Sequence, residues 1–439
     1  MTPDPNAPPG FEASRGRSVP TRPPQGGRPL PRAVWVALVF APVLGWFSAV
    51  CMLGASLWAL SRGSLRATCV HVLHGPQRWM AIIVLAWWLT LLAGDLLAAS
   101  PVAWWRDLRF LLVILPALVL TPMFLQAGIT HEQVGRWATW SVWLAVTVTS
   151  LEYFITVHGL GMIHHRPRAL SGNALFVSSM LVPMMMLAWL GVGQVTERRW
   201  LVPLVTHLAG IACLTAVLGA RTSTVVAIAL LPLPMIWFRR DLDWGLRAGL
   251  SLLALAAVST VLIFSTTTMS TWYEQRWGAL LGVVAGADAT TLADYGIATR
   301  ALHWPAAWQA FLQRPWLGYG FLNEMVVLGQ HLPAGSPVLP TAHQQYLSFL
   351  LWSGLPGLIT GSVLVGLPIL LALKTAGSPQ GRYAGWALGL PMLLNGLTDT
   401  VFDDLRIVSF HLMMTVALLA ATPSACENGG EPRIRTACS

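Results

Sequence analysis

Long apolar segments separated by short polar ones dominate this chain. Eleven such segments can be traced, at 33–60, 79–97, 108–126, 137–158, 170–193, 200–219, 222–238, 245–265, 346–373, 383–400 and 407–421. Most of them approach the roughly 20 residues that an α-helix needs to cross a bilayer, whereas membrane-spanning strands show short segments of alternating polarity. The pattern therefore predicts an all-α polytopic membrane protein.

The first apolar segment, 33–60, is too long for one ordinary span and short for two, and the placement of arginines decides between these interpretations. If it forms two short helices, the chain has twelve helices, both of its ends are cytoplasmic, and 18 of the 27 Lys and Arg residues lie on the cytoplasmic side. Those residues are Arg15, Arg17, Arg22, Arg28, Arg32, Arg62, Arg66, Arg78, Arg136, Arg198, Arg199, Arg239, Arg240, Arg247, Lys374, Arg382, Arg433 and Arg435. A single span would exchange the sides of every later loop. Because cytoplasmic loops are enriched in Lys and Arg, we predict twelve helices.

One long polar segment, 266–343, interrupts the apolar pattern, and the predicted topology puts it in the periplasm. Within it, 297–313 has apolar positions at helical spacing on one face, and Pro315 ends that helix. We expect the helix to lie on the membrane surface or to cap the bundle, although it can also be an ordinary loop helix packed on its own domain.

The predicted organisation has five parts. They are a disordered, basic, proline-rich cytoplasmic tail (1–32), nine transmembrane helices (33–265), the periplasmic loop with its amphipathic helix (266–343), three more transmembrane helices (344–421) and a cytoplasmic tail (422–439).

Composition agrees with a membrane protein, since 55% of the residues are hydrophobic and 10% are charged, against about 25% charged residues in soluble proteins. The net charge of +9 is assigned to basic flanks that orient the spans, and not to nucleic-acid binding. The five cysteines have no paired spacing, which argues against a disulfide framework or a thiolate metal site. Asp241-Leu242-Asp243 resembles the metal-binding DxD of sugar-nucleotide transferases, but its predicted cytoplasmic side argues against that role. We expect no metal and no other cofactor.

Arg221 lies between two apolar segments with almost no loop around it. An arginine at the membrane is costly unless it snorkels or meets an anion, and intramembrane charges are often functional. The predicted side is periplasmic, against the positive-inside bias. Thr222 or Ser223 can cap the following helix, whose N-terminus adds positive potential suited to a phosphate. The alternative is a snorkelling arginine paired with an acidic neighbour.

Two more candidates lie in the second half of the polar segment. Arg300 begins the predicted loop helix, and a guanidinium can bind two phosphate oxygens at once. His343 lies where the chain re-enters the membrane, and an imidazole can accept a proton at neutral pH. Taken alone, Arg300 is best explained as a solvated charge on a helix. It is a candidate because it is the first residue of a longer pattern that ends in Gly318-x-Gly320. The other ten histidines are interpreted as structural.

Arg166, Arg168 and Asp399 are secondary candidates. Arg166 and Arg168 form a second basic patch on the predicted periplasmic side. Asp399 belongs to an acidic group at the outer end of a predicted helix, where it either orients His343 or pairs with an arginine. Simple ion pairing of this group with Arg406 is an equally good explanation.

Together these residues provide an anion clamp and a base at one face of a helical bundle. Transfer from a lipid-linked pyrophosphate needs both, because pyrophosphate leaves readily once its charge is neutralised, and arginines can replace a metal ion in that role. A positioned base activates the acceptor hydroxyl, which is otherwise a poor nucleophile. The chain has no HExxH motif and no signature of a catalytic triad, which makes a hydrolase a weak interpretation.

Three short motifs occur in this order: Gly219-Ala220-Arg221-Thr222, Arg300…Trp304…Pro315…Gly318-x-Gly320, and Ala342-His343-Gln344-Gln345-Tyr346-Leu347…Gly354-x2-Gly357. They resemble those of the bacterial O-antigen ligases (WaaL), in the Wzy_C superfamily, which also contains O-antigen polymerases and PglL-type protein O-oligosaccharyltransferases. Gln344 departs from the family, which usually has Asn there; the amide is kept but the side chain is longer.

The resemblance implies a GT-C-type glycosyltransferase of the bacterial inner membrane. The implied donor is O-antigen on undecaprenyl pyrophosphate, and the implied acceptor is a sugar hydroxyl of the lipid A–core, joined at the periplasmic face without a metal and with inversion at the anomeric carbon. In this family role Arg221 and Arg300 bind the pyrophosphate, and His343 activates the acceptor or stabilises the transition state.

Other functions stay open at this point. A polymerase or a protein O-oligosaccharyltransferase fits the same motifs. A transporter for a lipid-linked or anionic solute would also use polarised arginines, but it predicts broken helices around a midplane site. The candidate groups instead lie at one face, which disfavours the transporter. Besides donor and acceptor, the expected partners are membrane lipids, and no nucleic acid.

Overall fold

A computed structural model gives the arrangement of the chain. It describes residues 32–44, 46–61, 77–98, 127–160, 174–192, 200–218, 220–238, 295–376 and 378–421, with short pieces at 110, 116–121, 124, 249, 278–279 and 281–282. The elements named in these ranges are all helices, in agreement with the predicted all-α class. They are α1 (Arg32–Leu44), α2 (Trp46–Ser61), α4 (Gln77–Leu97), α6 (His131–Tyr153), η1 (Phe154–Gly159), α7 (Ala174–Ala188), η3 (Trp189–Val192), α8 (Leu201–Ala212), η4 (Cys213–Val217), α9 (Arg221–Leu230), α10 (Pro232–Phe238), α13 (Tyr295–Gln313), η6 (Phe321–Asn323), α14 (Glu324–His331), α15 (Gln345–Val365), α16 (Leu367–Thr375), α17 (Pro379–Asn395) and α18 (Leu405–Ala420).

The first apolar segment forms two helices, α1 and α2, which pack against each other. They have 13 and 16 residues, fewer than the roughly 20 of an ordinary span. The pair of short helices that the arginine distribution favoured is therefore present.

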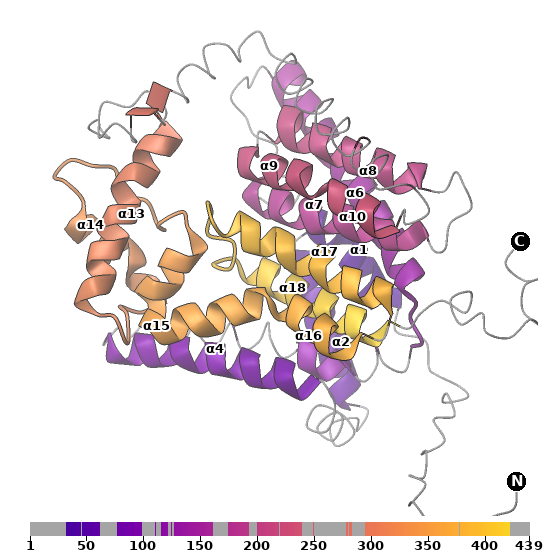
Figure 1. The fold of residues 1–439 in the computed structure, drawn as a ribbon, viewed down its shortest axis with the longest axis horizontal. Helices are drawn as coiled ribbons and strands as arrows, with labels where there is room; N and C mark the ends of the chain where they lie inside the picture. Colours follow the sequence, from indigo (N-terminus) through magenta and orange to yellow (C-terminus); the bar gives the residue numbers. More distant parts are fainter. Residues whose placement is uncertain are drawn as a thin grey trace, which may run out of the picture.

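A bundle of α6, α7, α17 and α18, with α1 and α8 against it, makes up the larger part of the described fold (Figure 1). α7 is at its centre, because almost every residue of that helix is buried, as expected of a helix that is apolar all round. The Tyr383 hydroxyl of α17 donates to the Met186 carbonyl oxygen of α7 at 2.8 Å. This hydrogen bond satisfies a buried phenol and joins the two central helices.

A second group consists of α4, α15, α13 and α14, with α13 and α14 to one side of the bundle (left in Figure 1). α15 packs along α4, and the hydroxyls of Thr90 and Thr360 lie 3.1 Å apart between them. α13 occupies the predicted loop helix and ends at Gln313, before Pro315. We call α13, α14 and the segment from 314 to 344 the cap.

Four described helices are long and apolar enough to cross a membrane: Arg78–Leu97, His131–Val157, Ala174–Gly191 and Gln345–Val365. Three shorter apolar helices are Leu201–Val217, Thr222–Phe238 and Leu405–Ala420. These lengths support a polytopic membrane protein. The predicted count of twelve also needs segments 245–265 and 108–126, which fall largely outside the described residues.

Two apolar segments end differently from the prediction. Segment 346–373 divides at Gly366 into α15 and α16. Segment 383–400 was predicted to be helical to its end, but α17 stops at Asn395 with Gly396 as its C-cap, and the next residues form a turn. Hydropathy alone misses this end, because the turn is itself partly apolar. We call residues 396–400 the Asp399 turn.

Candidate active site

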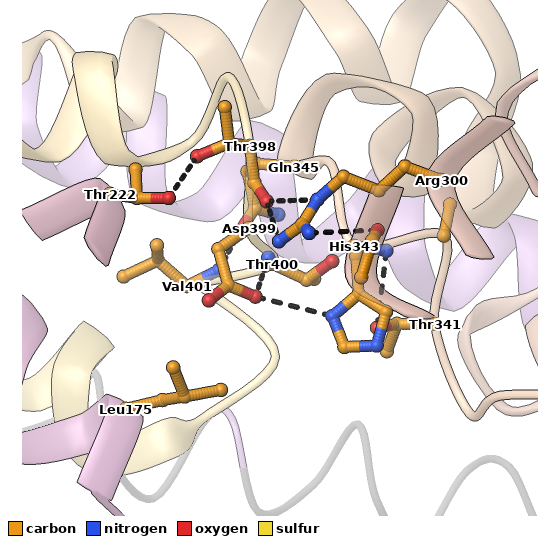
Figure 2. A network of polar contacts seen from close by, with 12 residues as sticks. Leu175, Thr222, Arg300, Thr341, His343, Gln345, Thr398, Asp399, Thr400 and Val401 are labelled. Atoms are coloured by element: carbon orange, nitrogen blue, oxygen red, sulfur yellow. Dashed lines mark hydrogen bonds and ion pairs between the residues drawn. The ribbon is translucent and has the colours of Figure 1, made fainter. Parts of the chain in front are cut away.

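The guanidinium of Arg300 lies against the Asp399 turn (Figure 2). Its Nε and Nη2 donate to the Thr398 carbonyl oxygen at 3.2 and 3.0 Å, and Nη1 donates to the Gly296 carbonyl oxygen at 3.1 Å. These two acceptors are neutral, so they orient the guanidinium without neutralising its charge. An oriented cation of this kind is suited to a bidentate anion such as a phosphate.

His343 has a backbone φ of 52°, and it is the one non-glycine residue with a positive φ in the described part of the chain. L-residues rarely adopt this left-handed conformation, and residues that do so cluster at functional sites. The preceding peptide is held from two sides: Trp304 Nε1 donates to the Ala342 carbonyl oxygen at 3.1 Å, and the Ala342 N–H donates to Glu324 Oε1 at 2.7 Å. Helices α13 and α14 thus fix the backbone that carries the imidazole.

His343 Nδ1 lies 3.4 Å from Asp399 Oδ1 (Figure 2). The two side chains are 27% and 17% exposed, so a substrate can reach the pair. The same carboxylate oxygen accepts a hydrogen bond from the Thr400 N–H at 2.9 Å. A carboxylate beside Nδ1 favours the tautomer in which Nε2 is the proton acceptor.

The acidic residue that pairs with Arg406 is Asp404, and not Asp399. Arg406 Nε donates to Asp404 Oδ1 at 2.9 Å, and its guanidinium lies over the Phe176 ring at 4.2 Å from the centroid. Of the two interpretations of Asp399 that the sequence left open, the geometry therefore favours the contact with His343.

Gln345 anchors the Asp399 turn to the start of α15. Its side-chain Oε1 accepts from the Val401 and Phe402 N–H groups at 2.7 and 2.6 Å, and its own N–H donates to the Gly396 carbonyl oxygen at 2.8 Å. Gln345 is 1% exposed, and buried backbone groups outside a helix need such partners. The residue that follows the His343-Gln344 dipeptide therefore holds both ends of the turn.

The first turn of α9 lies on the other side of the Asp399 turn. The Thr398 hydroxyl donates to Thr222 Oγ1 at 2.9 Å, and the Ser223 hydroxyl donates to Asn395 Oδ1 at 3.4 Å. The prediction that Thr222 or Ser223 caps α9 is wrong, because the N-cap is Ala220 and both hydroxyls bond to other elements. α9 begins at Arg221, whose side chain lies outside the described residues, so only its backbone is known to lie at the site.

The glycines of the second and third motifs allow two backbones to cross. α15 is broken at Ser353 and Gly354, whose backbone angles are not helical. The Tyr319 N–H donates to the Leu351 carbonyl oxygen at 2.7 Å and the Leu355 N–H donates to the Pro315 carbonyl oxygen at 2.8 Å.

No side chain fits at this crossing. A Cβ on Gly318 would lie 2.5 Å from the Leu351 carbonyl oxygen, and one on Gly354 would lie 2.5 Å from the Pro315 carbonyl oxygen. Both glycines also have positive φ, at 62° and 64°, a region that glycine adopts at low cost. The spacing of the motifs therefore reflects close backbone contact beneath the site.

Glu324, at the start of α14, is a buried acid that the sequence analysis did not single out. It is 2% exposed, and its Oε1 accepts from the Ser348 hydroxyl at 2.7 Å as well as from the Ala342 N–H. Burial raises the pKa of Glu324, while these hydrogen bonds and one from Trp352 oppose the increase. A glutamate in the apolar stretch Gly320–Leu328, of a chain with 18 acidic residues in all, is the signal that could have identified it.

His303 has the structural role assigned to it from the sequence. It is fully buried; its Nδ1 lies 2.7 Å from the Thr299 carbonyl oxygen, and its Nε2 accepts from the Leu339 N–H at 3.3 Å. These partners define a neutral ring with the proton on Nδ1. Burial lowers the pKa of His303, and the nearby His343 lowers it further.

Gln344 acts as the N-cap of α15, with its side-chain oxygen accepting from the Leu347 N–H. Asn is among the preferred N-cap residues, so the Gln344 amide takes the capping role that an Asn at this position would have. The secondary candidates Arg166 and Arg168 lie outside the described residues. Within the described part, no group of three or more His, Cys, Asp or Glu residues is arranged to hold a metal ion.

The fold and this site define a polytopic helical membrane protein with a histidine–carboxylate pair and an oriented arginine at the end of its bundle. Residues 206–360 match the family model described as Wzy_C: O-Antigen ligase. Residues 206–360 are therefore similar to this family, and the resemblance predicted from the three motifs is confirmed over that segment, which includes Arg221, Arg300 and His343.

The similarity to this family suggests a glycosyl-transferring enzyme of the O-antigen ligase and polymerase type. No curated protein and no solved structure gave a significant match to the chain. Asp399 and its turn lie beyond the matched segment, so their place at the site comes from the geometry.

Proposed function

We propose that this protein is an O-antigen ligase that transfers O-antigen polysaccharide from undecaprenyl pyrophosphate to a sugar hydroxyl of the lipid A–core. The observation that carries the proposal is the meeting of Arg300 and His343 on consecutive residues, Thr398 and Asp399. A cation that binds the donor pyrophosphate and a base that activates the acceptor hydroxyl must lie close to one reaction centre, and here both contact one turn.

In the proposed reaction, the acceptor hydroxyl oxygen attacks the anomeric carbon of the donor sugar. A new C–O bond forms as the bond from that carbon to the pyrophosphate oxygen breaks, and the configuration inverts. The hydroxyl proton passes to His343 Nε2, while Asp399 stabilises the resulting imidazolium through Nδ1. Undecaprenyl pyrophosphate leaves with the bonding electrons.

The leaving pyrophosphate gains negative charge, and cations must stabilise it in the transition state. Arg300, which the carbonyl oxygens of Thr398 and Gly296 orient, is the first proposed cation. Arg221 is the second proposed cation, because α9 begins at this residue beside Thr398. No side chain of the N-cap residue closes α9, so the N-terminus adds positive potential. We infer that no metal is needed, and we keep Arg166 and Arg168 as secondary candidates for binding the donor.

The proposed site faces the periplasm of a bacterial inner membrane. α17 runs from Pro379 to the turn that carries Asp399, and it has 17 residues. A helix of that length spans about 25 Å, which separates the site from the basic residues Lys374 and Arg382 by most of a bilayer. The positive-inside bias then favours the periplasm for the Asp399 turn.

Transfer by purified protein tests the proposal. Detergent-solubilised protein is mixed with undecaprenyl-pyrophosphate-linked glycan and lipid A–core in the presence of EDTA. The ligase predicts glycan on lipid A–core, whereas longer glycans formed from the donor alone would identify a polymerase. Transfer only to serine or threonine of an added protein would identify a protein O-oligosaccharyltransferase, and no transfer in any arm would contradict the glycosyltransferase.

A deletion strain gives an independent reading. The ligase predicts polymerised, lipid-linked O-antigen that is absent from lipopolysaccharide. Lipopolysaccharide carrying single repeat units would indicate the polymerase, and unchanged lipopolysaccharide would contradict the ligase.

A further inference from the structure

A closed ring of hydrogen bonds connects His343, Asp399 and the buried Glu324. Oε1 of Glu324 accepts from the Ala342 N–H and from the Ser348 hydroxyl, each at 2.7 Å. The Ser348 oxygen lies 3.3 Å from the Thr400 hydroxyl. Because the single Ser348 proton points to Glu324, the Thr400 hydroxyl must be the donor in that contact.

The ring then closes through the reacting pair. The Thr400 N–H donates to Asp399 Oδ1 at 2.9 Å, and the same oxygen faces His343 Nδ1. His343 follows Ala342 directly in the chain, which returns to Glu324. One carboxylate oxygen therefore holds two backbones, the one that carries His343 and the one that carries Asp399.

Because Glu324 is buried, the loss of any hydrogen bond in this ring is costly. Glu324, Ser348 and Thr400 are 2%, 0% and 9% exposed, so water cannot readily replace a lost partner. A buried acceptor or donor without a partner costs about 1–3 kcal/mol, and a break in the ring displaces the groups on either side. Trp352 Nε1 donates to the other oxygen of Glu324 and fixes the orientation of the carboxylate.

We propose that Glu324 is a positioning residue that acts through Ser348 and Ala342 to keep His343 aligned on Asp399. This inference rests on the proposed glycosyl transfer, and it adds a residue that touches no substrate. Glu324 sets the distance between base and carboxylate, while donor affinity depends on the arginines. Disturbance of the ring therefore lowers kcat and leaves the KM for the donor nearly unchanged.

Ser348→Ala opens the ring while keeping Glu324, and Ser353→Ala is the matched control. Both serines are buried on α15, at 0% and 2% exposure, but Ser353 Oγ has no hydrogen-bond partner among the residues that the structure describes. Ser348→Ala is expected to lower kcat about 10- to 100-fold, the scale of a displacement of about 1 Å at a reacting group, with the donor KM within about twofold. Ser353→Ala should stay within about twofold of wild type in both constants. Equal kcat values for the two variants would overturn the proposal, as would a loss confined to KM.

A second pair of variants tests Glu324 itself. Glu324→Gln keeps an acceptor at Oε1 but turns an amide NH2 toward the Trp352 indole N–H, so that two donors meet. Trp352→Phe removes that conflict, and the double variant should recover at least about tenfold of the kcat lost in Glu324→Gln, because the amide can then hold its oxygen toward Ser348 and Ala342. A double variant no better than Glu324→Gln would overturn the ring as the means of action.

Hydrogen exchange separates this proposal from the proposed function. In Ser348→Ala, peptides covering 341–344 and 396–402 should exchange faster together, and in Ser353→Ala neither should change. This result needs no substrate, so it stands even if wild-type protein transfers no glycan and the proposed function fails. Faster exchange in only one of the two segments would overturn the inference that Glu324 couples them.

Discussion

The bundle and the cap satisfy their buried polar groups in different ways. In the bundle, threonine hydroxyls donate back to their own helix: Thr149 donates to the Ala145 carbonyl oxygen at 2.6 Å, and Thr415 donates to the His411 carbonyl oxygen at 2.7 Å. In the cap and the Asp399 turn, polar side chains bond across elements, as Glu324 and Gln345 do. The difference follows from the backbone, because helices satisfy their own amides and irregular segments need side chains.

This contrast predicts where substitutions have their effect. A buried threonine hydroxyl in the bundle is satisfied within its own helix, and its loss changes little beyond its own turn. A polar group in the cap fixes the relative position of two segments, and its loss moves catalytic groups. Activity should therefore be sensitive to the cap, while the bundle should respond mainly through stability.

Gly318→Ala should have the largest effect among the tests of this contrast. The new Cβ would meet the Leu351 carbonyl oxygen at 2.5 Å and the Ser353 amide nitrogen at 2.6 Å, so the crossing beneath Glu324 must shift. We expect a loss of transfer of about 100-fold together with a loss of about 1–3 kcal/mol of stability from the left-handed backbone. Initial rates and thermal unfolding in detergent measure the two effects.

Gly335→Ala is the matched control for Gly318→Ala. Gly335 also has a positive φ, of 83°, but a Cβ there would meet nothing within 4 Å. This variant should lose stability by a similar left-handed strain and keep its activity within about twofold. Equal losses of activity in the two alanine variants would show that the crossing has no special role.

Asp399→Asn comes next in size. Asparagine keeps an oxygen that can accept from the Thr400 N–H, but it removes the charge that stabilises a protonated His343. We expect a loss of kcat of about 10- to 100-fold, a part of the 10²–10⁴-fold that general-base catalysis contributes. Asp404→Asn, which alters the Arg406 pair instead, is the comparison. A larger kcat loss in Asp404→Asn would contradict the assignment of Asp399.

His303 gives the stability of the cap a dependence on pH. Burial lowers the pKa of His303 below its usual 6.5, so the unfolded chain takes up a proton before the folded one does. Stability is then lost progressively as the pH falls below 6.5 toward the folded pKa, because protonation breaks the hydrogen bond from the Leu339 N–H. Melting temperature plotted against pH should fall more steeply for wild type than for His303→Gln. Parallel curves would contradict the neutral, buried role of His303.

Thr415→Val should have the smallest effect. Valine has nearly the same shape as threonine, and the lost hydroxyl bonded to a carbonyl of the same helix. We expect unchanged kcat within about twofold and a change in stability of no more than about 1 kcal/mol. A large loss of activity would remove the proposed contrast between bundle and cap.

The apolar pattern predicted the helices well wherever a helix is a single uninterrupted apolar segment. Segments 79–97 and 407–421 correspond closely to α4 and α18. Hydropathy failed at Gly396 and Gly366, because helix ends there depend on local turns within apolar sequence. It also could not show that α15 breaks at Gly354, since the partner backbone comes from 315–320.

The candidate site was predictable as far as its residues repeat family motifs. Arg300 and His343 were identified, and they come together at the Asp399 turn. Asp399 itself had two equal explanations, since sequence spacing does not reveal which arginine or histidine an acid faces. Glu324 was missed, because its role depends on donors from the segment before α15 and from α15 itself, which no local pattern connects.

Single-turnover transfer by His343→Ala with donor bound tests the central claim most directly. His331→Ala is the control, since His331 lies in the same cap and its Nδ1 faces the Val327 carbonyl oxygen of its own helix. The account predicts a loss of about 10²–10⁴-fold in the transfer step, donor binding within a few-fold of wild type, and a control near wild-type rate. Transfer by His343→Ala at the rate of the control would contradict His343 as the base.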